Sequence, residues 1–474
     1  MSLKKNIVSN FILTASTIIF PLITLPYITR TLSATSIGKV FYIDSFTQYF
    51  ILFSAIGIPY YGVREVAKLK FDKKKISQFV LELVTIQFIL SSLFSLIFLY
   101  LHIYFNALAA NSTLIKIGCI AIISNAFLIE WFYQGIENFT YITIRSLVIK
   151  SLSVLCILFL VIKKTDSEIY YLILSVTFLA NAILNFGNFV RKHFVSFKVS
   201  KQIFSHLRPL LVLFSINISI SLYTIMDTII LGSLTSVEQV SFYNIPLKIV
   251  KIFWTVMGGI GIVLIPRMSS FFADDDKPAI QALMKKSISI VLLLGIPFFF
   301  AGIFFAEDIL LIVSGKQYIK SKEALQILSI VPLIIGLCNV FGTQYLLAIG
   351  LEKKILIATV FGFVISLGLN FMLIPHLGFI GASIACVVAE LTVCVVVFIA
   401  ARKTISIAVD YNLLFLVLAS VAAAFIFWII LHNYFEHLIL MVLTSFLYCF
   451  SFVALQYLLF KNELIKSIFK FQIR

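Results

Sequence analysis

Charged residues are scarce in this chain of 474 residues: Asp, Glu, Lys and Arg make up 12% of it, whereas about a quarter of an average soluble domain is charged. Hydrophobic residues make up 61%, and the mean hydropathy is +1.08. This composition excludes a water-soluble enzyme, a disordered chain and a nucleic-acid-binding module. The net charge of +16 lies in short basic clusters between long uncharged runs, as in membrane proteins.

The six cysteines give no sign of a reactive or metal-binding site, because all of them lie inside apolar runs and none forms a Cys-x-x-Cys pair. They predict small core side chains, without a disulfide framework or a metal site. The chain also lacks a Gly-rich nucleotide-binding loop and any long polar segment. These absences disfavour an ATP-driven pump and an extramembrane catalytic domain, so we expect neither enzymatic activity nor a cofactor.

Long apolar runs dominate what is present. About 20 apolar residues are needed to cross a bilayer as a helix, and fourteen runs meet this length: 7–28, 40–62, 79–101, 117–136, 146–162, 169–190, 209–231, 246–266, 288–313, 325–350, 355–375, 379–401, 411–431 and 438–460. The sequence therefore predicts an all-α, polytopic membrane protein with about fourteen transmembrane helices.

Lys and Arg are distributed unevenly between the two sides of these spans. Of the 37, 26 fall on the side of the N-terminus, eight on the other side and three within spans. Positive loops face the cytoplasm, so we expect both termini in the cytoplasm.

A basic stretch at 191–208 divides the first six spans from the rest. A faint internal similarity, between residues 31–42 and 233–243, has a spacing that suits two parallel six-helix repeats. We therefore expect an N-terminal lobe at 1–205, a second lobe at 206–405, and two additional helices with a tail at 406–474.

Ionisable residues inside spans are costly and often functional. Lys248 and Lys251 share one helix face, and Lys150 lies inside the fifth predicted span. Arg30 and Arg64 lie at the ends of spans and are solvated end charges or anion ligands. If these five cations meet in a cavity, they would attract a phosphate-bearing ligand.

Carboxylates in spans are candidates for ion coupling or for structural pairing: Asp44, Asp227 and Glu390. Glu130 is followed by Trp131 and Tyr133, so an interfacial position in the aromatic belt competes with a functional one. Prolines in several spans indicate bent helices.

Seven segments together resemble the O-antigen and polysaccharide repeat-unit flippases, in the superfamily that also holds lipid II flippases and multidrug and toxin extrusion transporters. They are PLITLPYITRTL (21–32), YYGVREVAK (60–68), EWFYQGIE (130–137), YTIMDTIILG (223–232), SFYNIPLKIVKIF (241–253), LIPRMS (264–269) and GFIGASIACVVAE (378–390). The resemblance covers most of the chain. Arg30 and Arg64 match positions where relatives place cavity arginines.

The resemblance implies two six-span lobes around a cavity and movement of an undecaprenyl-pyrophosphate-linked oligosaccharide from the cytoplasmic to the periplasmic leaflet of the bacterial inner membrane. It also implies that a polysaccharide polymerase and a chain-length regulator are partners. One alternative remains: a cation-coupled exporter of small molecules on the same fold, which predicts an acidic cavity. A glycan polymerase or ligase is disfavoured, because it predicts a long periplasmic loop with catalytic residues, and the predicted outer segments are short.

Overall fold

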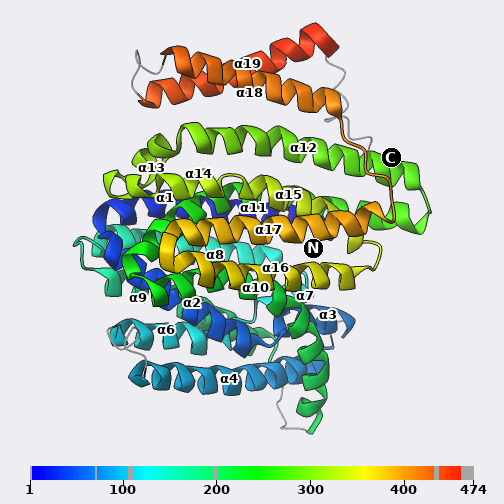
Figure 1. Ribbon diagram of the computed structural model, residues 1–474. Coiled ribbons are helices and arrows are strands. Elements are labelled where there is room, and N and C mark those ends of the chain that lie inside the picture. Colours follow the sequence, from blue (N-terminus) through cyan, green and yellow to red (C-terminus); the bar gives the residue numbers. More distant parts are fainter. Residues whose placement is uncertain (1–2, 70–71, 105–110, 196–200, 432–436, 461–474) are drawn as a thin grey trace. The chain divides into compact units, whose positions relative to one another are not determined.

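The computed structural model describes residues 3–69, 72–104, 111–195, 201–431 and 437–460, and every regular element in these ranges is helical (Figure 1). The chain divides into two compact units, unit 1 (Met1–Phe242) and unit 2 (Tyr243–Arg474). The all-helical, polytopic fold class predicted from the apolar runs is confirmed.

Unit 1 holds ten helical elements and the start of an eleventh, within the described residues. They are α1 (Leu3–Thr31), α2 (Ala34–Ala55), α3 (Ile58–Lys68), α4 (Lys73–Tyr104), α6 (Ser112–Asn125), α7 (Glu130–Gly135), α8 (Phe139–Leu160), α9 (Ser167–Lys192), the 3₁₀ turn η1 (Lys201–His206), α10 (Leu207–Leu234) and the first turns of α11 (Val237–Ala273).

Two of the predicted spans in unit 1 are broken helices. The second span stops at Ile56 and Gly57, whose φ angles of 37° and 80° are left-handed. A left-handed residue ends a helix, and Pro59 suits the first turn of the next one, so α3 starts there. The fourth span breaks between α6 and α7. Both breaks place a short helix at a membrane-span end.

Helix pairs that are distant in sequence build unit 1. Helix α1 packs along α8, α6 lies against α2, α4 and α9, and α10 packs on α2 and α3. Figure 1 shows α4 beside α6. An apolar core gathers α3, α4 and α7 around the buried rings of Trp131, Phe132 and Tyr133. Of the two alternatives for this segment, an interfacial position does not fit these three rings, which are buried in protein.

Unit 2 continues α11 and adds ten helical elements within the described residues: α12 (Lys277–Phe304), α13 (Ala306–Ser314), the 3₁₀ turn η2 (Lys316–Ser321), α14 (Lys322–Leu328), α15 (Val331–Asn339), the π-helical segment η3 (Val340–Leu346), α16 (Glu352–Leu377), α17 (Phe379–Arg402), α18 (Tyr411–Leu431) and α19 (His437–Phe460). Figure 1 shows α18 and α19 side by side.

Helices α16 and α17 form the most extensive contact in unit 2. A Cβ at Gly381 would come within 2.7 Å of the Leu373 carbonyl carbon and oxygen, so only glycine allows this approach. Their junction is the single residue Gly378, with φ 55°.

All fourteen predicted spans fall on helices of the structure. Within the described residues, eleven helices are long and apolar enough to cross a membrane, and the other three predicted spans fall on α10, α11 and α19. The two units divide within α11, between Phe242 and Tyr243, whereas the predicted lobe limit at 205/206 precedes α10 and stays a prediction.

Candidate functional site

A buried guanidinium forms the centre of a polar network in unit 1. The Arg145 side chain, on α8, is only 3% exposed. It donates to the Glu130 carboxylate on α7, to the Asn185 side-chain oxygen on α9 and to the Ser146 hydroxyl. Asn185 in turn donates to the Leu128 carbonyl at 3.2 Å. Residues of α7, α8 and α9 thus bind the two terminal nitrogens of one buried charge, as such a group requires, while its Nε has no hydrogen-bond partner among the described residues.

Lys150 lies five residues further along α8 and is half-buried. Its ammonium donates to the Ser16 hydroxyl on α1 at 3.0 Å and lies 5.9 Å from the centre of the Phe20 ring. The Glu130 carboxylate is near enough to attract Lys150 electrostatically. Glu130 therefore serves two cations of the same helix.

Arg30 and Arg64, also in unit 1, lie far from each other. Arg30 is in the last turn of α1 and donates to the Pro26 carbonyl at 3.0 Å. Arg64 is on α3, exposed, and pairs with Glu65 at 2.9 Å. Helix α2 separates them and rises roughly 33 Å over its 22 residues. Ser16, the partner of Lys150, precedes Arg30 by fourteen residues, or roughly 21 Å of helix. The three cations of unit 1 thus lie at three depths.

Lys248 and Lys251 lie on α11, in unit 2, and both are half-buried. Their spacing of three residues puts them on one face of the helix, as the sequence predicted. How the two lysines combine with the cations of unit 1 stays a prediction.

The three carboxylates proposed for coupling are enclosed to different extents. Asp44, on α2, accepts from the Gln48 amide at 3.4 Å and is half-buried. Asp227, on α10, is 3% exposed and acts electrostatically on Tyr49 of α2. Glu390, on α17 in unit 2, is 5% exposed. Two of the three are therefore core groups.

A second polar network joins η1 to the body of unit 1. The His206 ring makes hydrogen bonds through Nδ1 to the Tyr61 hydroxyl, at 2.9 Å, and through Nε2 to Glu82, at 3.0 Å. The Gln78 amide donates to the other Glu82 oxygen at 2.7 Å. These side chains line a cavity of about 710 Å³ together with Lys74 and neighbouring residues.

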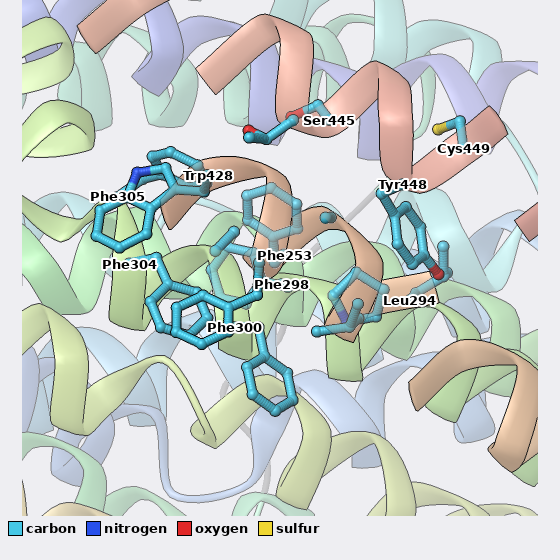
Figure 2. A pocket seen from close by; sticks show the side chains of 16 residues that line it. Phe253, Leu294, Phe298, Phe300, Phe304, Phe305, Trp428, Ser445, Tyr448 and Cys449 are labelled. Carbon is cyan, nitrogen blue, oxygen red and sulfur yellow. The ribbon is translucent and has the colours of Figure 1, made fainter. Parts of the chain in front are cut away.

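Unit 2 contains an aromatic pocket of about 290 Å³ between α12 and the pair α18 and α19. Figure 2 shows the rings of Phe298, Phe300, Phe304 and Trp428 around it, with Ser445 and Cys449 on the α19 side. The wall is almost entirely apolar, so the pocket suits a hydrocarbon chain and does not suit a charged headgroup.

Sequence reasoning missed Arg145, Glu82 and His206. The fifth span was expected to begin at 146, so Arg145 was assigned to a loop, but α8 begins at Phe139 and Arg145 lies within it. The prediction of a loop position was wrong because Asn138 caps the helix earlier: its side chain accepts from the Tyr141 N–H. That Asn, seven residues before Arg145, was the available signal.

The fold and these buried charges define a multi-pass helical membrane protein with cationic and acidic side chains inside its spans. The chain belongs to the polysaccharide biosynthesis protein family, whose model matches residues 3–272; a MatE model also matches residues 213–372. The expected membership of the repeat-unit flippase group is thereby confirmed at family level. A relative from Escherichia coli (strain K12) named "Putative O-antigen transporter" is 26% identical over 397 residues, 82% of this chain and 94% of the relative.

Two solved structures share the fold. The lipid II flippase MurJ in an inward closed conformation aligns with a TM-score of 0.64 at 14% identity, over 94% of this chain and 100% of MurJ. An inward-facing multidrug resistance MATE family transporter of the MOP superfamily aligns with a TM-score of 0.64 at 15% identity, over 82% and 94% of the two chains. At such low identity the likeness concerns the fold alone.

Proposed function

We propose that this chain flips an undecaprenyl-pyrophosphate-linked oligosaccharide from the cytoplasmic to the periplasmic leaflet of the bacterial inner membrane. Family membership and the name of the E. coli relative support this function. Such a ligand needs a protein, because its hydroxyls and charges would lose their hydration in hydrocarbon.

The distribution of cations in unit 1 is the observation that carries the proposal. Arg64 on α3, Lys150 on α8 and Arg30 on α1 lie at three successive depths, so a pyrophosphate would meet a partner at each depth as it crosses. Lys248 and Lys251 on α11 are proposed as the anion-binding residues of unit 2. Together with Arg30, Arg64 and Lys150 they make up the proposed anion-binding surface. The aromatic pocket of unit 2 supports a hydrocarbon carrier (Figure 2).

Coupling is assigned to carboxylates within the spans. Asp44, Asp227 and Glu390 are proposed as sites whose protonation or ion binding resets the protein between inward-open and outward-open states by alternating access. Their burial supports this assignment, because a buried carboxylate changes its neighbours strongly when it loses its charge. Both termini are proposed to lie in the cytoplasm, and a polysaccharide polymerase and a chain-length regulator are the proposed protein partners.

Deletion of the gene tests the function. We expect undecaprenyl-linked sugars to accumulate in the cytoplasmic leaflet, surface polysaccharide to disappear, and the intact gene to restore both. Unchanged lipid-linked sugars and surface polysaccharide in the deletion strain would overturn the proposal.

A multidrug exporter is the competing function, favoured by the MatE model over residues 213–372. It predicts that the deletion strain becomes sensitive to cationic drugs while its surface polysaccharide is unchanged. The cationic side chains of unit 1 argue against a cavity for cations.

A further inference from the structure

The Glu130 carboxylate of unit 1 is partly exposed, although it binds a buried arginine. Its side chain is 36% exposed, whereas its partner Arg145 is 3% exposed. Glu130 opens α7, as the residue that follows the break after α6. The exposed end of the buried network is therefore an anionic group, even though the charge at the centre of the network is positive.

Charge balance around Glu130 is incomplete. Arg145 contacts Glu130 directly, and Lys150 lies within its electrostatic reach, so two cations share one carboxylate and the three groups carry +1. The remaining partners of both cations are neutral: Asn185, Ser146 and Ser16. Replacing the Glu130 charge would raise this local charge to +2.

We propose that Glu130 is an internal counter-ion that competes with the pyrophosphate of the transported lipid for the positive field of Arg145 and Lys150. This inference rests on the proposed function. When no ligand is present, Glu130 neutralises one of the two cations. When a pyrophosphate approaches, Lys150 exchanges Ser16 for a phosphate oxygen, while Arg145 stays paired with Glu130.

The counter-ion limits the affinity of the protein for the pyrophosphate. A transported ligand must bind well enough to enter and weakly enough to leave, and two uncompensated cations in a partly buried place would hold a pyrophosphate too long. Glu130 lowers the affinity without removing Lys150, and Arg145 acts as a positioning residue that fixes the carboxylate.

Binding of farnesyl pyrophosphate to the full chain in lipid nanodiscs tests the proposal. We expect Glu130→Gln to bind this probe roughly tenfold more tightly than the wild type, because one repulsive unit charge is removed at short range. We expect Lys150→Gln to bind it more weakly. The matched control is Glu168→Gln, which removes an exposed carboxylate at the start of α9 and should leave the affinity unchanged.

A charge-paired variant separates electrostatics from structure. In Glu130→Gln/Arg145→Gln the local charge returns to +1, so the affinity should lie within about twofold of the wild type. This variant also decides the matter if Glu130→Gln alone does not fold. A loss of binding in the paired variant would show that the pair itself holds the pyrophosphate and would overturn the counter-ion role.

Two results distinguish this inference from the function on which it rests. If the wild-type gene restores surface polysaccharide but folded Glu130→Gln binds the probe no more tightly than the wild type, the counter-ion role is wrong and the flippase proposal stands. If the wild type binds no probe and gene deletion leaves lipid-linked sugars unchanged, both are wrong.

Discussion

Arg145 shows how one side chain can organise three helices. It is buried, charged and bonded to residues from α7 and α9, so its burial is tolerated only because each partner is present. Arg64, by contrast, is exposed and pairs with its neighbour Glu65, where solvent screens the attraction. Replacing Arg145 should therefore cost more stability than replacing Arg64.

Replacing Arg145 by Met should lower stability by about 1–3 kcal/mol, because Glu130 and Asn185 lose the hydrogen bonds that this buried charge donates to them. Arg64→Met is the matched control and should cost about 0–1 kcal/mol. Thermal unfolding of the detergent-solubilised variants measures both. Equal unfolding temperatures for the two variants would contradict the structural role of Arg145.

Asp166 provides a prediction for pH dependence at a loop. The pKa of this carboxyl is lowered by backbone N–H groups of Lys163 and Ile162, with a further contribution from the Lys163 charge. A lowered carboxyl pKa stabilises the fold fully above the ordinary Asp value of about 3.9, and the contribution is lost as the pH falls through the lowered value.

Asp166→Asn should therefore unfold at a lower temperature than the wild type at pH 7, and the difference should shrink on acidification. Unfolding midpoints measured between pH 7 and pH 3 check this, and a difference that stays constant with pH would show that the carboxylate charge is not involved.

Elements in unit 1 are tied together by polar groups at their ends. His206, in the turn before α10, lies between Tyr61 of α3 and Glu82 of α4. The Glu82 side chain is 4% exposed, so loss of the imidazole would leave a buried carboxylate with only the Gln78 amide.

His206→Leu should accordingly destabilise the protein by about 1–3 kcal/mol and increase amide hydrogen exchange in η1 and the start of α10. His193→Leu is the control, because His193 stacks on Phe189 and its replacement removes no carboxylate partner. Unchanged exchange in His206→Leu would mean that the hydrogen bonds do not hold the turn.

Hydropathy predicted which segments form helices better than it predicted where those helices begin, end or break. All fourteen apolar runs are helical because satisfying the backbone in a membrane leaves no other choice for a single segment. The bend expected from proline in the second span falls at Ile56–Gly57, just before Pro59. The break before Glu130 was not predicted, because it leaves the hydropathy of the run unchanged. For the same reason Asn138, the cap of α8, was overlooked, and with it the interior position of Arg145.

Candidate site residues were predicted individually, whereas their partners were not. Lys150 was identified because a cation in an apolar run is visible in sequence, but Ser16 lies 134 residues away and no local pattern connects them. The burial of Asp227 and Glu390 agrees with their position inside spans; their coupling role stays a prediction.

At the scale of the whole molecule, transport should depend on cations in both units. Lys251→Glu should abolish restoration of surface polysaccharide in the deletion strain, Lys251→Arg should keep most of it, and Arg64→Ala should reduce it, with membrane insertion intact in every case. Immunoblots of membrane fractions provide the insertion control. Normal restoration by Lys251→Glu would remove this lysine from the anion-binding surface.

The junction of α16 and α17 affects how the protein is inserted into the membrane during its synthesis. The two helices are separated by Gly378 alone, and Gly381 allows their backbones to approach closely, so the pair can form as a hairpin as soon as both have left the ribosome. We expect Gly381→Val to lower the amount of protein that reaches the membrane, whereas Gly368→Ala, on the open face of α16, should not. Pulse-labelled membrane fractions measure this yield, and a variant lost here would fail during synthesis, before any lipid could be carried.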